Sequence, residues 1–183
     1  GDAKVFYAEG NHIYLHEYKN GAWIDSVVIG TSTTFFSSSK IATTQNGKIL
    51  IVSVFGDKIA SVYFNGTSWV DHGELKFQSA QSVSLSNARN LNIAIDESGK
   101  GILTFSHYKS NSTYSNYRAE FNGTTWTMPV NENAQHAVGT INKVAMNAAG
   151  KIVHMWQTYD DIIHFQENNG SGWEAEYTFN SGM

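Results

Sequence analysis

The sequence has no cysteine, one proline, two arginines and few charged residues, and each shortage excludes a class of protein. Without cysteine there is no disulfide, no thiolate metal site and no cysteine nucleophile. Twelve Lys and Arg against sixteen Asp and Glu give a net charge of −4, so no basic surface can neutralise a run of nucleic-acid phosphates. No apolar stretch reaches the roughly 18 residues of a membrane-spanning helix. No long segment shows a helical apolar period.

What the sequence does contain is a repeated phrase, a short polar turn with glycine followed by tryptophan. It occurs at 20–23, 65–69, 122–126 and 169–173, and its glycines are 45, 57 and 47 residues apart. A period of this size indicates one supersecondary unit copied along the chain. The Asn-Gly pairs are typical of type I′ hairpin turns. Three of them also match the N-glycosylation pattern, but the turn is the preferred interpretation.

A second phrase repeats in step with the first: an Ile-Ala or Val-Ala segment, a polar turn, Gly-Lys and an apolar run. It occurs at 40–49, 92–102 and 143–152. Together the phrases predict a unit of four strands, a to d, in which the apolar strand b is buried on both faces and strand d lies at an edge. The sequence therefore predicts an all-β fold, a β-propeller of about four blades of four antiparallel strands. A two-sheet β-sandwich is the alternative.

We expect one domain, 1–183, with repeats of about 1–38, 39–88, 89–139 and 140–183. The first repeat begins at strand b, so there are three a strands against four each of b, c and d. In closed propellers the two chain ends usually share a blade that covers the open edge. We therefore expect an incomplete or oligomer-completed propeller, with a homodimer as the preferred form.

The repeats resemble the propeller repeats of many secreted bacterial proteins, with the best match at 145–173. The Gly-x-x-Trp turn is similar to the Asp-box turn of sialidases, although its Ser/Thr and Asp positions hold other residues here. Sialidases clamp the substrate carboxylate with three arginines. This chain has only Arg89 and Arg118. Fucose-binding propeller lectins share a Gly-x-Trp turn and use an Arg and a Glu in each sugar site, a pattern that two arginines cannot repeat over four blades.

The turn tryptophans are interpreted as wedges between neighbouring blades, with sugar-stacking platforms as the alternative. His154 lies in an apolar run and is interpreted as a core histidine bonded to a neighbouring blade. No metal site or cofactor is expected, because the histidines are not clustered with other ligands. Two pairs of adjacent carboxylates, Asp160–Asp161 and Asp96–Glu97, are interpreted as solvated turn residues, since neighbours on a strand point to opposite faces.

In a four-strand meander the a–b and c–d turns lie on one rim, and the variable b–c loops and d–a crossovers lie on the other. Variable loops on a rigid scaffold carry function. The predicted ligand-binding residues on the variable rim are Arg89, His107, Tyr108, His136, Tyr159, Asp160 and Asp161.

The preferred function is a non-catalytic binding module for a glycan or a protein partner, secreted or on the cell surface. The alternative is a glycoside hydrolase or lyase acting on polysaccharide, or a fragment of one, with Asp160 or Asp161 at the channel mouth. A structural or assembly role is the third hypothesis.

Overall fold

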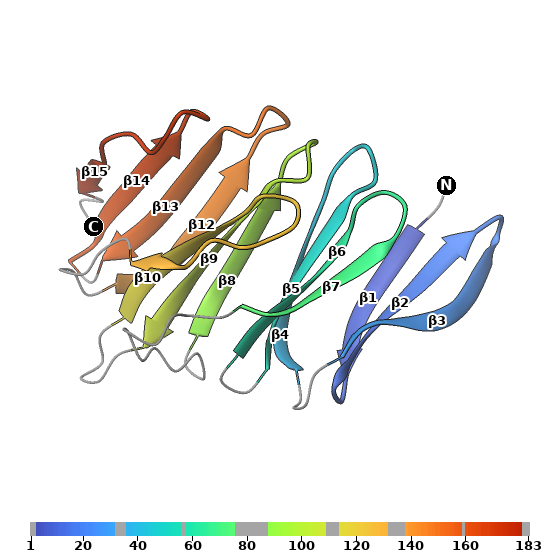
Figure 1. Ribbon diagram of the computed structural model, residues 1–183. Helices are drawn as coiled ribbons and strands as arrows, with labels where there is room; N and C mark the ends of the chain where they lie inside the picture. The colour runs from blue at the N-terminus through green and yellow to red at the C-terminus, as the bar shows by residue number, and fades with distance from the viewer. Residues whose placement is uncertain are drawn as a thin grey trace.

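A computed structural model describes residues 3–31, 36–55, 58–75, 88–108, 114–131, 138–158 and 160–180. Over these ranges the chain forms four antiparallel sheets that follow one another in chain order (Figure 1). The first sheet consists of β1 (Ala3–Glu9), β2 (His12–Lys19) and β3 (Ala22–Thr31). The second consists of β4 (Phe36–Thr43), β5 (Ile49–Phe55), β6 (Lys58–Phe64) and β7 (Trp69–Glu74).

The third sheet consists of β8 (Ala88–Ile95), β9 (Gly101–Tyr108), β10 (Tyr114–Phe121) and β11 (Val130–Asn131). The fourth consists of β12 (Val138–Met146), β13 (Ile152–Thr158), β14 (Ile162–Asn168) and β15 (Tyr177–Asn180). Each sheet is a meander, and the strands that open successive sheets lie next to one another, β4 by β8 and β8 by β12. This succession of packed sheets confirms the predicted propeller architecture, with four sheets in place of the two of a sandwich. The described residues include no helix that could cross a membrane.

The two kinds of repeated turn lie along one edge of the row of sheets (Figure 1). Gly47, Gly99 and Gly150 have φ of 84°, 95° and 80° in the a–b turns, as expected for hairpin turns. Three of the four c–d turns differ from the type I′ prediction, and the first agrees with it. Asn20 has positive φ, as that turn requires, but positive φ falls on glycine alone in the other three. There the loop before the tryptophan is one residue longer, and the asparagine side chain accepts backbone N–H groups, as Asn122 Oδ1 does from Thr124 and Thr125 at 3.0 and 2.8 Å.

The outer strands of the third and fourth sheets are shorter than the sequence predicts. Trp126 and Trp173 each form a single bridge, to Phe121 and Asn168, and the regular ladder resumes only at β11 and β15. In the third sheet the interruption contains Pro129, which has no N–H to donate to a ladder.

The turn tryptophans of the last three sheets are wedges against the preceding sheet, which confirms the preferred interpretation for these three, whereas Trp23 of the first sheet is 55% exposed and contacts its own sheet. Trp69 packs edge-on against Phe6 of the first sheet, with ring centroids 5.7 Å apart. Trp126 Nε1 donates to Ser61 Oγ of the second sheet at 2.8 Å. Trp173 Nε1 donates to Glu120 Oε1 of the third sheet at 2.9 Å. Each of these tryptophans therefore fixes the position of its sheet on the one before it.

The three seams between sheets differ in chemistry. Apolar clusters fill the first two, built around Ile13, Leu15 and Val62 in one and around Leu50, Leu103 and Phe105 in the other. These side chains stabilise the fold by removing apolar surface from water. In the two middle sheets strand b is buried along its length, since β5 is at most 4% exposed from Ile49 to Val54. This confirms the prediction for the middle sheets.

A polar network occupies the seam between the third and fourth sheets. Asn142 of β12 donates to Asn116 Oδ1 and Ser106 Oγ of the third sheet, at 3.3 and 3.5 Å. His154 Nε2 lies 3.0 Å from Asn142 Oδ1. The histidine is fully buried, as predicted. Its bond to Asn142, however, lies within its own sheet, and Asn142 makes the connection to the neighbouring sheet.

The two end sheets each have a face that no other described part of the chain covers. The first open face carries Val5, Tyr7, Tyr14, His16, Tyr18, Trp23 and Val28. The last open face carries Val153, Met155, Ile163, Phe165, Glu167, Tyr177 and Phe179. Strand b is therefore exposed on one face in β1 and β13, with Val5 47% and Val153 43% exposed. The two-sided burial predicted for strand b is wrong for these strands, because burial of the second face requires a neighbouring sheet.

Candidate functional site

The residues predicted on the variable rim are divided between two sheets. Arg89 and His107 lie on the neighbouring strands β8 and β9, whereas Asp160 and Asp161 lie in the turn between β13 and β14. Both aspartates are exposed, and Asp161 Oδ1 accepts a bond from Gln157 at 3.1 Å, as expected for turn residues. His136 and Tyr159 lie outside the described residues, as does the side chain of Tyr108.

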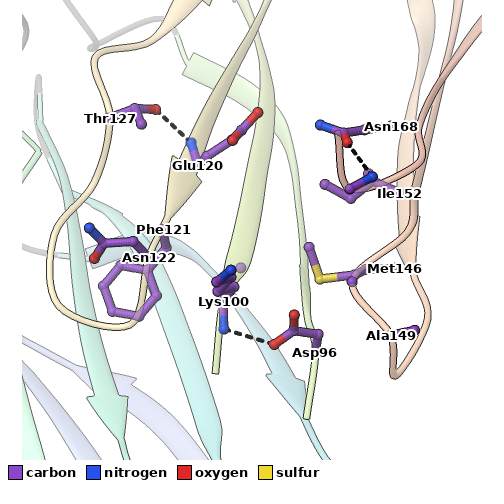
Figure 2. Close-up of a pocket in the computed structure, with 13 residues that line it drawn as sticks. Asp96, Lys100, Glu120, Phe121, Asn122, Thr127, Met146, Ala149, Ile152 and Asn168 are labelled. Carbon is purple, nitrogen blue, oxygen red and sulfur yellow. Dashed lines mark hydrogen bonds between the residues drawn. The ribbon is translucent and has the colours of Figure 1, made fainter. Parts of the chain in front are cut away.

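A pocket of about 380 Å³ opens instead on the opposite edge, between the third and fourth sheets (Figure 2). We call it the rim pocket. The polar residues that line it are Asp96, Lys100, Glu120, Asn122, Thr127 and Asn168. Phe121, Met146 and Ile152 provide its apolar lining. Pockets that bind small molecules combine an apolar surface with a few polar groups in this way.

Asp96 is held in the rim pocket by the a–b turn of the third sheet. Its Oδ1 accepts the Lys100 N–H at 2.9 Å and the Ser98 hydroxyl at 2.6 Å, which closes the turn. Its Oδ2 lies toward the fourth sheet, 2.8 Å from the position that a Cβ on Gly150 would take. Asp96 is only 5% exposed, so its interpretation as a solvated turn residue is wrong: the fourth sheet packs over this turn. Glycine at 150 therefore leaves the space in which this oxygen sits.

Glu120 projects into the rim pocket from the end of β10 (Figure 2). Its Oε1 accepts the indole N–H of Trp173, and its backbone N–H donates to Thr127 Oγ1 at 2.8 Å. Arg118, two residues earlier, stacks on Trp173 with Cζ 3.9 Å from the ring centroid. One edge of the rim pocket is thus formed by the contacts that Arg118 and Glu120 of the third sheet make with Trp173 of the fourth sheet.

The corresponding space between the second and third sheets is closed. Tyr63 stands there at the position of Glu120, because each precedes the phenylalanine that pairs with the turn tryptophan. Tyr63 is 4% exposed, and its hydroxyl is so close to Gly99 that a Cβ there would overlap it. Burial and the Asp96 carboxylate both raise the pKa of Tyr63, so the hydroxyl stays neutral.

A second difference between the repeats concerns the contact between the a–b turns of neighbouring sheets. Between the second and third sheets, the Glu97 carboxylate accepts the N–H groups of Gln45 and Asn46 at 2.8 and 3.1 Å. Lys48 Nζ donates to the Glu97 carbonyl at 2.8 Å. In the fourth sheet Ala148 stands at the position of Glu97, so this link between adjacent turns has no counterpart at the rim pocket. Tyr63 and Glu97 therefore close the gap between the second and third sheets. Glu120 and Ala148 stand at their positions between the third and fourth sheets, and there the gap is open.

A smaller pocket of about 210 Å³ lies between β7 and the c–d turn of the third sheet. His72, Glu74 and Trp126 line it. The His72 ring packs edge-on against Phe121, with centroids 5.0 Å apart, and its Nε2 is buried without a hydrogen-bond partner. Burial lowers the pKa of His72 below its ordinary value of 6.5, although Asp71 acts in the opposite direction. The neutral ring is therefore the form that the fold prefers.

This lowered pKa predicts a loss of stability in acid. Above pH 6.5 the ring is neutral in both states, but as the pH falls below 6.5 the unfolded chain binds a proton that the folded chain resists. We expect His72→Phe to reduce the fall in unfolding free energy between about pH 7.5 and 5, as measured by urea titration. The other histidines are the same in both proteins, so they serve as the internal control. Equal falls in the variant and the parent would contradict the prediction.

The rim pocket was not predicted from the sequence, which assigned the repeated turns a structural role. No motif marks the rim pocket in the sequence. The residues that mark it are those that differ at equivalent positions of successive repeats: Tyr63 corresponds to Glu120, and Glu97 corresponds to Ala148. Among the described residues no group of three or more His, Asp or Glu side chains could hold a metal ion. The rim pocket can instead accept hydrogen bonds on its carboxylates and both donate and accept them on its amides.

Comparisons with known proteins support the fold. No protein-family model matches the chain, and no curated protein matches it. Among solved structures, a fungal lectin from Aleuria aurantia, described as a six-bladed β-propeller with a novel fucose recognition mode, is similar over the whole chain at 15% identity and a TM-score of 0.53. A protein of unknown function from Dyadobacter fermentans is similar over 93% of the chain, at 16% identity and 0.51.

An ulvan lyase, a polysaccharide lyase, is similar over 95% of the chain, at 10% identity and a TM-score of 0.55. The chain spans 58%, 59% and 54% of the lengths of these three proteins, respectively. At these identities the likeness concerns the fold alone, and it identifies the four sheets as part of a β-propeller architecture.

Proposed function

We propose that this chain is a non-catalytic glycan-binding module and that the rim pocket holds the sugar. The observation that carries the proposal is the opening between the third and fourth sheets, where Glu120 stands in place of Tyr63. Two carboxylates and two amides surround an apolar surface there. Such groups suit a ligand with adjacent hydroxyls on one side and C–H groups on the other, since hydrogen bonds to charged acceptors are stronger than neutral ones. The propeller lectins with the same architecture support the glycan class.

The proposal predicts that Glu120→Tyr abolishes glycan binding by closing the pocket as Tyr63 closes the gap before it. A glycan array identifies the sugar, and titration calorimetry then measures the affinity of each variant. We expect Glu120→Gln to weaken binding by roughly 10- to 100-fold, because a hydrogen bond to a charged group contributes about 1.5–3 kcal/mol. Glu9→Gln, which changes an exposed carboxylate at the end of β1 in the first sheet, is the matched control. Undiminished binding by a folded Glu120→Tyr protein would overturn this site.

An enzyme acting on polysaccharide is the second candidate, favoured by the presence of two carboxylates, Asp96 and Glu120, in one pocket. Paired carboxylates are the acid and base of many glycosidases. Size analysis of polysaccharides incubated with the protein distinguishes the two functions. Shortened chains that disappear with Glu120→Gln would establish catalysis, and intact chains with retained binding would establish the module.

Three further proposals concern an alternative binding surface, the location of the protein and its self-association. The variable rim, with Arg89 and His107 among its residues, stays a predicted alternative surface for a glycan or protein ligand. The resemblance to repeats of secreted bacterial proteins supports a place outside the cell or on its surface. The apolar open faces support self-association, with a homodimer as the simplest form.

A further inference from the structure

The two open faces carry large apolar side chains that are exposed to water. On the first, Tyr7, Trp23 and Val28 are 38%, 55% and 44% exposed. On the last, Tyr177 and Phe179 are 49% and 57% exposed, and both rings stack on Phe165, with centroids 4.9 and 5.3 Å away. Contiguous apolar surfaces of this kind mark interaction sites. The two faces lie at opposite ends of the row of sheets (Figure 1), so they cannot cover each other within one copy.

The seams inside the molecule show how such faces pack. In the last two seams the tryptophan of the c–d turn lies on strand c of the sheet before it, and its indole N–H donates to an acceptor there. That acceptor is Ser61 for Trp126 and Glu120 for Trp173. Trp69 also packs on the sheet before its own, but through a ring contact with Phe6 of β1. The contact is therefore directional, with a tryptophan on one side and a strand-c surface on the other.

Each open face carries one half of this contact. Trp23 pairs with Tyr18, as Trp69 pairs with Phe64, and its ring lies on the first open face, which no described sheet covers. On the last open face Glu167 precedes Asn168, which pairs with Trp173, so Glu167 holds the position of Glu120. Phe165 correspondingly holds the position of Arg118. A hollow of about 430 Å³ lies beside Glu167 and Val153.

We infer that two copies of this chain associate head to tail, with the first open face of one copy packed against the last open face of the other. This inference rests on the self-association proposed above and gives it a specific contact. The Trp23 indole of one copy lies on Phe165 of the second and donates to its Glu167 carboxylate. A second copy is the partner because one chain carries both halves of the contact. A heterologous contact of this kind closes into a ring or extends to further copies.

Sedimentation velocity over a range of concentrations tests the inference with two variants. Trp23→Asp places a charge on the first open face, and Phe165→Asp places one on the last open face. We expect the parent to associate, and each variant alone to associate at least tenfold more weakly, because a buried tryptophan at the centre of an interface dominates affinity. Mixing the two variants restores association as a one-to-one complex, since the mixture retains one intact contact. Phe179→Asp replaces Phe165→Asp if the latter does not fold.

The outcomes separate the specific contact from self-association in general. A parent that stays monomeric at high micromolar concentration overturns both. Association of either variant alone at parental strength overturns the head-to-tail contact, because a symmetric pairing uses only one of the two faces. Failure of the mixture to form a complex also overturns it. Glycan binding by the rim pocket is measured separately and does not depend on any of these results.

Discussion

Replacing Trp156 by alanine should lower the free energy of unfolding by about 3–5 kcal/mol, as for other fully buried aromatic residues. Trp156 is 1% exposed in the seam between the third and fourth sheets. Its ring stacks on His164, with centroids 5.4 Å apart and planes 8° apart, and lies 4.9 Å from His154. Alanine leaves a cavity between two histidines that have little means of moving into it. Urea denaturation measures the loss.

Trp156→Phe is the control for this prediction, because it keeps an aromatic ring on His164 and fills most of the space. The indole N–H of Trp156 is buried without a hydrogen-bond partner, so phenylalanine leaves no acceptor unpaired. We expect this variant to recover most of the stability that alanine loses. A loss below about 1 kcal/mol for Trp156→Ala, the level of an average substitution, would show that the seam contributes little to the fold.

Gly99→Ala should destabilise the protein by about 2–5 kcal/mol, through backbone strain and a steric overlap together. Gly99 has φ of 95°, which a residue with a Cβ rarely adopts. Its Cβ would also overlap the hydroxyl of Tyr63, whose ring is held between the second and third sheets. Thermal or urea denaturation gives the change in stability.

Gly47 separates the two causes, because it occupies the same turn position one sheet earlier. Its φ of 84° imposes a similar strain, but a Cβ there has no atom within 4 Å. We expect Gly47→Ala to cost only the strain, about 1–2 kcal/mol. If the two alanine variants were equally stable, Tyr63 would have room to move, and the account of why this gap is closed would be wrong.

The repeated elements of the fold were predictable from the sequence because they depend on local chemistry. Gly47, Gly99 and Gly150 each follow polar residues between apolar runs, so their turns could be placed without knowledge of the neighbouring sheets. The order of strands followed from these turns. The wedge role of Trp69, Trp126 and Trp173 followed from their repetition at one position of the unit.

Features that depend on a neighbouring sheet were not predictable in this way. Val5 and Val153 belong to apolar strands like any other strand b, yet one face of each strand is open because no described sheet lies against it. The rim pocket depends on a comparison between seams. Glu120 is an ordinary polar residue near a strand end until Tyr63 shows what fills the same space elsewhere. The assignment of function to variable loops gave no reason to look for a pocket among the repeated turns.

The polar network of Asn142, Asn116 and Ser106 has a consequence for the rim pocket, which opens in the same seam. Burial of apolar area is not directional, so by itself it sets the angle between two sheets less sharply than hydrogen bonds do. An amide that bonds two partners tolerates far less displacement, since hydrogen bonds weaken steeply with distance and angle. The third and fourth sheets are therefore joined by a contact that sets their angle. The width of the gap at the rim is fixed by bonds made deeper in the seam, so the pocket is held open before any ligand arrives.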